Sequence, residues 1–393
     1  MTWNSSTVYE QRVCFVLEVL EDRFSFSHLC ERYGISRTTG YTWMNRYQEG
    51  GLEALRDRSN RPAQCPHATP EAVVERIVEL RIRFGWGPRK LRKLLLGEIG
   101  WAPARSTVGE ILERHDLVVK RRKHPAAPVH PGQPIVPMDA PNSSWTVDFK
   151  GHFRMLNGKY CYPLTVQDSF SRCLLCCEAL PSTSVDDAKP IFARLFREYG
   201  LPDYFLSDNG SPFASIGLGR LTRLRAWWIR LGIQHLTIQP GEPQQNPRHE
   251  RMHRDLKREA TRPPQANFTA QQRHFDDFRH TFNHIRPHEA LGDETPASVY
   301  TPSTRIMPRA LAPLEYPAHF EVRKVSTNGG IRWETNWVNV SSVIPGEPVG
   351  LEPVGPNTWQ VYYGPVTLGW LDETTLKITD IEQKTGRNPK TYD

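Results

Sequence analysis

Residues 145–153, WTVDFKGHF, decide how the chain is interpreted. Apolar and polar side chains alternate along this stretch, which predicts a half-buried strand that carries Asp148. Two more acidic residues follow in other settings. Asp208 lies in YFLSDNGSPF, where an apolar run stops at a turn, and Glu250 lies in NPRHERMHRDLK, the predicted start of a basic helix. The three carboxylates can meet at one point if the chain between them folds back.

Three converging carboxylates are the minimum equipment for holding two divalent cations. Mg²⁺ prefers oxygen ligands and keeps several waters, and two ions about 3.5–4 Å apart can promote phosphodiester displacement. Without metal, two carboxylates 4 Å apart repel by roughly 4 kcal/mol at an effective dielectric of 20. For each residue alone another explanation stays open. An Asp in a turn is often only a turn former, and a Glu near a helix start often only favours the helix dipole.

Five motifs of the chain occur in a fixed order: WTVDF, DSFSR, LSDNGSPF, PGEPQQNPRHERMHRDLK and NHIRPHEALGDETPASVY. In this order they resemble the catalytic core of integrase-type insertion-sequence transposases, which are relatives of retroviral integrases. The resemblance covers residues 140–302 strongly and the flanks more loosely. It implies a ribonuclease H-like core in which Asp148, Asp208 and Glu250 form the catalytic acidic triad. It also implies that this triad binds two Mg²⁺ ions, with Mn²⁺ as a substitute.

The chain departs from the family pattern ahead of Glu250. The family usually has Asn-Gly where this chain has Asn246 and Pro247. Proline suits the first position of a helix, with Asn246 as its N-cap, but it would fail if the family's glycine needs a positive φ. The spacing from Asp208 to Glu250 is also longer than in the shortest members, and we place the extra residues near SIGLGRLTRL.

Composition limits the class of protein. The chain has 393 residues, 38% of them hydrophobic, which predicts two or more domains with real cores. No apolar run is long enough for a membrane span, and the N-terminal residues lack the apolar core of a signal peptide. The net charge of +7 favours an anionic partner such as DNA. Seven cysteines without paired spacing predict a reducing cytoplasm, and Cys173, Cys176 and Cys177 are expected to be buried thiols.

Residues 1–60 are predicted to form a helix-turn-helix DNA-binding domain. Helices are expected at VYEQRVCFVLEVL, at FSFSHLCERYGIS up to Gly34, and at SRTTGYTWMNRYQEGG between a Ser36 cap and a Gly50-Gly51 stop. The last helix would enter the major groove by its N-terminal part. A plain three-helix bundle is the alternative. The expected base-reading residues are Arg37, Thr38, Thr39 and Tyr41, with Arg46 as a phosphate contact.

A second helix-turn-helix unit is predicted over residues 69–120, between proline-rich, basic linkers at 51–70 and 118–144. Its first helix would begin at Thr69-Pro70, and its third would be capped near Ser106. The resemblance places such a unit ahead of the core, and a solvated basic face is the alternative. Its expected DNA contacts lie on the middle helix, at Arg89, Lys90, Arg92 and Lys93.

Alternating strands and helices over residues 140–302 predict an α/β layer, and the resemblance assigns it to the ribonuclease H-like type. Asp168 is expected to be a turn residue. Arg254 and Lys257 share a helix face with Glu250 and would follow the DNA backbone, unless Glu250 and Arg254 form only an exposed pair. Residues His280, His284 and His288 are expected to be surface or packing residues.

Residues 317–380 contain short alternating runs around Asn328-Gly329, which predict hairpins and a small β-barrel. In the resembling family a DNA-contacting barrel holds this place. The chain is therefore predicted to be multidomain, with all-α helix-turn-helix units, a central α/β core and a C-terminal barrel.

The predicted function is a DNA transposase that cuts at its element's ends and joins the 3′ hydroxyls to target DNA. Its partners would be double-stranded DNA, both inverted-repeat ends and target, and further copies of itself on DNA. The expected setting is the bacterial cytoplasm, with the nucleoid and without a membrane. Two alternatives stay open: a helix-turn-helix regulator with an inactive core, and a ribonuclease H-like nuclease that cuts but does not join.

Overall fold

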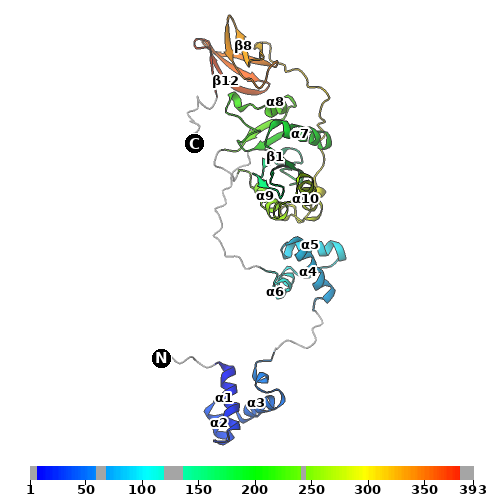
Figure 1. Cartoon of the computed structure of the whole chain (residues 1–393), viewed down its shortest axis with the longest axis vertical. Helices are drawn as coiled ribbons and strands as arrows, with labels where there is room; N and C mark the ends of the chain where they lie inside the picture. Colours follow the sequence, from blue (N-terminus) through cyan, green and yellow to red (C-terminus); the bar gives the residue numbers. More distant parts are fainter. Residues whose placement is uncertain (1–6, 59–67, 119–135, 240–244, 381–393) are drawn as a thin grey trace. The chain divides into compact units, whose positions relative to one another are not determined.

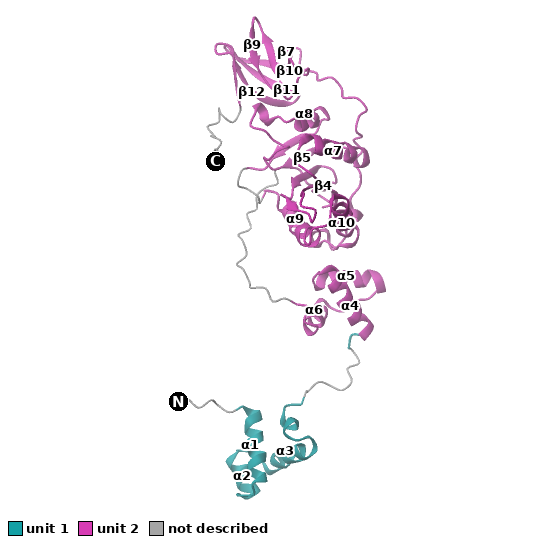
Figure 2. Ribbon diagram, in the orientation of Figure 1, with its two compact units in different colours: residues 1–70 teal, residues 71–393 magenta. Residues whose placement is uncertain are grey.

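A computed structural model of the chain describes residues 7–58, 68–118, 136–239 and 245–380. The chain forms two compact units, residues 1–70 and 71–393, and each is described by itself (Figure 2). Most of the two predicted linkers and the tail beyond residue 380 lie outside the described residues.

The first unit is a small helical bundle around Phe15, Val16, Leu29, Cys30 and Leu55, all buried. Its elements have the predicted order, and one short 3₁₀ turn follows them. They are α1 (Val8–Leu20), α2 (Phe26–Arg32), α3 (Arg37–Gly50) and η1 (Leu52–Leu55).

Local signals in this unit have the predicted effect. The Ser36 hydroxyl accepts from the backbone N–H of Thr39 and caps α3, and Gly51 ends that helix with a φ of 62°. Gly40 is buried on α3, where a Cβ would lie 2.9 Å from the sulfur of Cys30. Glycine at this position lets α3 approach the rest of the bundle closely.

The second unit begins with three helices, α4 (Glu71–Phe84), α5 (Pro88–Ile99) and α6 (Arg105–Arg114). Ile77, Trp86 and Leu91 are among the buried residues that hold them together. The N-cap of α6 is Ala104, and no side chain caps this helix, so the predicted cap near Ser106 is wrong. The helix begins at Arg105, directly after the non-helical Ala104, whose ψ is 152°.

The central domain is a mixed sheet in which β3 (Tyr160–Asp168) has partners on both sides. It pairs antiparallel with β1 (Ser144–Phe149), β4 (Leu174–Leu180) and the short β2 (Phe153–Arg154). The strand β1 also pairs in parallel with β5 (Tyr204–Ser207), which in turn pairs in parallel with β6 (Gln234–Thr237).

Helices cover both faces of this sheet, as Figure 1 shows. On one face, α7 (Val185–Tyr199) and α8 (Arg223–Arg230) pack through Phe192 and Trp228 against strand residues such as Trp145 and Phe205. On the other face, α9 (Pro247–Glu259) and α10 (Phe268–His280) contribute side chains such as Met252 and Phe275. The remaining short elements of the domain are η2 (Leu218–Arg220), η4 (Thr281–Ile285), η5 (Glu289–Leu291) and α11 (Pro296–Val299).

The C-terminal module consists of two open sheets, so the predicted closed barrel is not formed by the described strands. Five strands pair antiparallel in the order β13-β12-β11-β10-β7, and β8 and β9 form a separate hairpin after Asn328-Gly329. The hairpin contacts β7 and β13, the two edges of the larger sheet, without ladder pairing to either. The strands are β7 (Glu321–Lys324), β8 (Gly330–Trp333), β9 (Asn336–Asn339), β10 (Pro348–Gly355), β11 (Thr358–Tyr363), β12 (Val366–Asp372) and β13 (Lys377–Thr379).

Within the described parts of the chain, no helix is both long and apolar enough to cross a membrane.

Candidate active site

The three candidate carboxylates lie at the ends of three elements of the central domain. Asp148 is near the end of β1, and Asp208 directly follows β5. These two strands run parallel, with Thr146 opposite Leu206, so their carboxyl ends reach the same edge of the sheet. Glu250 lies in the first turn of α9.

Electrostatics shows that the three groups are close enough to interact. Burial, together with the smaller effects of the negative charges of Asp208 and Glu250, raises the pKa of Asp148 to about 7. The positive charge of Lys150 and a hydrogen bond from the backbone of Phe149 oppose this shift. Burial also raises the pKa of Asp208, although its carboxylate accepts a hydrogen bond from the backbone N–H of Gly210 at 3.1 Å. Such a cluster of negative charges is suited to binding a divalent cation.

The start of α9 explains how Glu250 reaches the cluster. Pro247 is the first residue of this helix, as expected, so the family's glycine is not needed here for a positive φ. The Asn246 side chain does not cap the helix, and that part of the prediction is wrong. Asn246 is 8% exposed, and its backbone oxygen accepts from the N–H of Glu250. Residues 240–244, which precede this turn, lie outside the described part.

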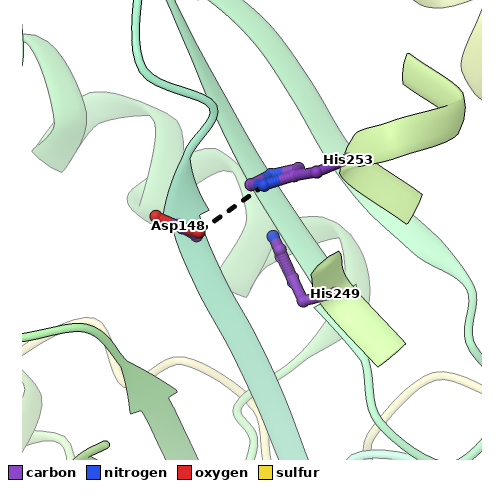
Figure 3. Close-up of side chains that lie close together, drawn as sticks. All are labelled: Asp148, His249 and His253. Atoms are coloured by element: carbon purple, nitrogen blue, oxygen red, sulfur yellow. Dashed lines mark ion pairs between the residues drawn. The ribbon is translucent and has the colours of Figure 1, made fainter. Parts of the chain in front are cut away.

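Two buried histidines beside the cluster were not predicted as site residues. His249 and His253 lie one turn apart on the buried face of α9, with ring centroids 4.5 Å apart. The Nδ1 of His253 is 3.5 Å from the Oδ2 of Asp148 (Figure 3). Burial lowers the pKa of His249 to about 3 and that of His253 well below its usual range, so both rings are neutral. Their spacing of four residues around Glu250 in NPRHERMHRDLK is the signal that could have revealed them.

Other candidate groups of the core are structural. Asp168 is fully buried, and its carboxylate accepts from the backbone N–H of Asn142 and from the N–H and hydroxyl of Ser171. It closes the turn after β3, as predicted. Cys173, Cys176 and Cys177 are buried free thiols, also as predicted.

Comparisons with known proteins place this geometry in a family. Two profiles, both described as Integrase core domain, match residues 138–243 and 231–296. A Helix-turn-helix domain profile matches residues 11–63, and a Homeodomain-like domain profile matches residues 39–112. A 39.2 kDa protein of insertion element IS476 from Xanthomonas euvesicatoria is 28% identical over 275 residues, which cover 68% of this chain and 75% of that protein.

By these matches the central domain belongs to the integrase-core family of insertion-sequence transposases.

Solved retroviral integrases are more distant from this transposase chain. The catalytic core of HTLV-2 integrase in complex with magnesium is 16% identical and covers 42% of this chain and 99% of its own, with a TM-score of 0.34. A chain of the simian T-cell lymphotropic virus intasome with PP2A regulatory subunit B56 gamma is 17% identical and covers 74% and 97%, with a TM-score of 0.37. The catalytic core of BIV integrase is 20% identical and covers 40% and 93%, with a TM-score of 0.31.

The candidate DNA contacts of the first helical unit lie along α3 of the transposase. Arg37 and Thr38 are exposed at its start. Tyr41 is 57% exposed and stacks on Phe26 with ring centroids 4.3 Å apart. The Thr39 hydroxyl bonds that of Ser36 at 2.9 Å, and Arg46 lies over the ring of Trp43. Arg37, Thr38 and Tyr41 are therefore the residues of this set with the most surface to offer.

Two of the four candidate contacts on α5, Arg89 and Lys93, form ion pairs with the central domain. Arg89 pairs with Asp293 at 2.9 Å and also with Glu289, and Lys93 pairs with Glu294 at 2.8 Å. Burial, with a smaller effect of Arg286, lowers the pKa of Lys90 to about 8. Arg92 donates to the backbone oxygen of Pro103. We call residues 289–294 the acidic segment.

On α9 the transposase exposes one strongly charged face. Glu250, Arg254 and Lys257 are all exposed, whereas His249, Met252, His253 and Leu256 are buried. This division follows the three- and four-residue spacing of a helix. Arg254 and Lys257 thus lie on the same face of α9 that carries Glu250.

Proposed function

We propose that the chain is a DNA transposase that cleaves at the ends of its element and joins the resulting 3′ hydroxyls to target DNA. The observation that carries the proposal is that the charges of Asp208 and Glu250 both act on Asp148, with Asp148 and Asp208 at the same edge of the central sheet. Family membership supports the reaction class, and the solvent access of Glu250 suits a large substrate.

The carboxylates would bind two divalent cations, Mg²⁺ with Mn²⁺ as a substitute. Asp148 and Asp208 would hold one ion, and Asp148 and Glu250 the other. Such ions activate an attacking oxygen and stabilise a leaving oxygen in phosphodiester displacement. Asp148 has the central role because both other carboxylates act on its charge. Arg254 and Lys257, exposed on the same helix, would pair with phosphates of the bound DNA.

We assign DNA recognition to the two helical regions, residues 1–60 and 69–120, and catalysis to residues 140–302. In the first region Arg37, Thr38, Thr39 and Tyr41 would read bases and Arg46 would bind phosphate. In the second, Arg89, Lys90, Arg92 and Lys93 would contact DNA once their protein partners release them. The β module at 317–380 would add further contacts. Two ends must be joined together, so the active form would be an oligomer on DNA.

The central test is strand joining with purified full-length protein, an end duplex and a target plasmid. Asp148→Asn, Asp208→Asn and Glu250→Gln should each abolish joining while end binding persists. Asp277→Asn is a matched control, since Asp277 is exposed on α10 away from the carboxylate cluster. A triad variant that joins at a near-normal rate removes that residue from the site.

Replacement of the metal ion is an independent test of the same proposal. Joining should require Mg²⁺ or Mn²⁺, and Ca²⁺ should support binding without turnover. Activity after thorough chelation would rule out the metal mechanism. Cleavage without joining would favour a nuclease, and end binding with neither reaction would favour a regulator with an inactive core.

A further inference from the structure

A buried polar cluster links α9 to the sheet directly behind Asp148. Its members are His249 and His253 on the helix, Thr146 on β1 and Thr165 on β3. All four are almost completely buried, with exposures of 2% or less. Buried polar atoms require partners, so the hydrogen bonds of this cluster determine which ring nitrogens remain available.

The hydroxyl of Thr165 fixes the state of both rings. It carries one hydrogen, which it donates to the backbone oxygen of Asp148 at 3.0 Å. Its lone pairs therefore accept from the Nε2 atoms of His249 and His253, which lie 2.8 and 2.7 Å away. Each neutral ring then bears its hydrogen on Nε2, and each Nδ1 presents a lone pair.

The two Nδ1 atoms have different surroundings. That of His249 lies 2.7 Å from the Thr146 hydroxyl, whose one hydrogen has this nitrogen and, at the longer distance of 3.3 Å, the backbone oxygen of Gln167 as acceptors. That of His253 faces the Asp148 carboxylate, and among the described residues the structure records no other polar partner for it. A lone pair and an ionised carboxylate oxygen repel each other unless a proton or a metal ion lies between them. Figure 3 shows the three side chains close together, with the imidazole of His253 joined to Asp148 by the dashed line and His249 beside them.

The separation of the His253 Nδ1 from the Asp148 Oδ2 fits a shared metal ion better than a hydrogen bond. Their distance of 3.5 Å exceeds the usual range of about 2.7–3.2 Å for an N–H···O bond. Two ligand atoms each about 2.1 Å from one ion stand about 3.0 Å apart at a right angle and about 3.4 Å apart at a tetrahedral angle.

We propose that His253 is a metal ligand, which binds through Nδ1 the ion held by Asp148. The proposal rests on the assignment of Asp148 to the metal site made above. His249 serves as a positioning residue, because its bonds to Thr146 and Thr165 hold the tautomer of the pair. A nitrogen ligand suits Mn²⁺ and later transition metals better than Mg²⁺ or Ca²⁺. The site should therefore prefer Mn²⁺ over Mg²⁺ more strongly than an all-oxygen site does.

The test is pulsed electron paramagnetic resonance of Mn²⁺ bound to the full-length protein. Coordinated imidazole gives a ¹⁴N modulation of the spin echo, which the wild-type chain should show. In His253→Gln the amide NH₂ can take the place of Nε2–H toward Thr165, but the Nδ1 ligand is gone. This variant should lose the modulation, and its Kd for Mn²⁺ should rise by about 10-fold or more. His249→Gln should keep the modulation.

Two controls separate the possible outcomes. Asp148→Asn should also lose the signal, and a modulation that survives in both Asp148→Asn and His253→Gln would come from adventitious histidines and overturn the proposal. Wild-type Mn²⁺ binding without ¹⁴N modulation would overturn it too, even if the protein joins DNA normally. Conversely, nitrogen-coordinated Mn²⁺ in a chain that joins no DNA would contradict the proposed function and leave the ligand assignment standing. Circular dichroism of each variant checks folding.

Discussion

At the scale of single residues, Asp148 is the residue that contacts or interacts with the other members of the candidate site. It ends a buried strand, faces a neutral histidine and experiences the charges of two further acids. The same surroundings that suit a cation make the carboxylate costly when no cation is bound. Its effect on stability should therefore depend on both pH and metal.

The first prediction concerns Asp148→Asn in the absence of metal. The folded-state pKa, about 7, lies above the ordinary value of 3.8. The folded chain thus holds this proton more tightly, and the associated stability is present below pH 4 and lost as the pH rises through 7. At pH 8 in EDTA the variant should be more stable than wild type by about 2–4 kcal/mol. At pH 4 the difference should vanish.

Denaturant unfolding followed by tryptophan fluorescence measures this difference. The variant Asp277→Asn serves as the control and should show no such pH dependence. Added Mn²⁺ should stabilise the wild type and not Asp148→Asn. Equal stability of the two chains at pH 8 in EDTA would mean that the carboxylates do not interact as described.

The second prediction separates two arginines of α3. Arg37 is exposed at the first position of the helix, whereas Arg46 is half-buried over Trp43. Arg37→Ala should reduce the preference for end DNA over random DNA by about 1–3 kcal/mol, and Arg46→Ala should weaken binding to all DNA alike. Fluorescence anisotropy with both duplexes measures the two effects. Arg23→Ala, an exposed arginine before α2, should change neither value, and an unchanged preference in Arg37→Ala would remove Arg37 from base recognition.

At the scale of elements, α5 and the acidic segment form a contact that DNA would have to compete with. Exposed ion pairs contribute little each, usually under about 1 kcal/mol. Here they are supported by Ile285, which packs against the helical core, and by Arg286, which lies over the ring of Trp86. The acidic segment thus forms ion pairs with Arg89 and Lys93, two of the four basic side chains that the sequence suggested for DNA binding.

The third prediction follows from this contact. The triple variant Glu289→Gln, Asp293→Asn, Glu294→Gln should bind random duplex DNA several-fold more tightly than wild type. Because Arg89 and Lys93 become available for phosphates, the slope of log K against log salt should become steeper by roughly 2. A matched triple variant, Glu198→Gln, Asp276→Asn, Asp277→Asn, removes equal charge from other exposed surface. If both variants gain equally, the effect is one of net charge and the contact plays no part.

Much of the element order could be predicted from the sequence, because capping and apolar spacing act locally. Ser36, Gly51 and Pro247 each stand where their chemistry predicts. The cap near Ser106 and the capping role of Asn246 were wrong, because α6 begins after Ala104, which has no capping group, and the Asn246 side chain makes no capping hydrogen bond. The β module was expected to close because its strands are short, but closure depends on ladder pairing at the edges, which composition does not determine.

The candidate site could also be predicted only in part from the sequence. Motif order suggested the three carboxylates, and the structure gives them a common electrostatic environment, while their catalytic roles stay predictions. His249 and His253 were not predicted as site residues, since the sequence of a basic helix does not show which of its histidines are buried. The partners of Arg89 could not be predicted either, because they lie about 200 residues away in sequence.

At the scale of the whole molecule, residues 1–70 and 71–393 form separate compact units. A chain built this way can bind one DNA end with its first unit while its core acts on another end. The alternative is a monomer that binds and cuts the same end.

The fourth prediction tests catalysis in trans. One protein carries Asp208→Asn, and the other lacks residues 1–68, which removes the first unit and leaves α4–α6 with the core. Each alone should be inactive in strand joining. Their mixture should recover a measurable fraction of wild-type joining, with an optimum near equal amounts. No recovery at any ratio, with both proteins folded and the first still binding end DNA, would favour a monomer acting in cis.

The division of the chain into two compact units also has a consequence during synthesis. The first unit is complete by residue 70, whereas the inner face of the central sheet requires α9, α10 and Phe282. At roughly 5–20 residues per second, ribosomes need on the order of 10–40 s to make the chain between these points. If the first unit binds DNA as we propose, a nascent chain would be able to do so well before its carboxylate site is assembled.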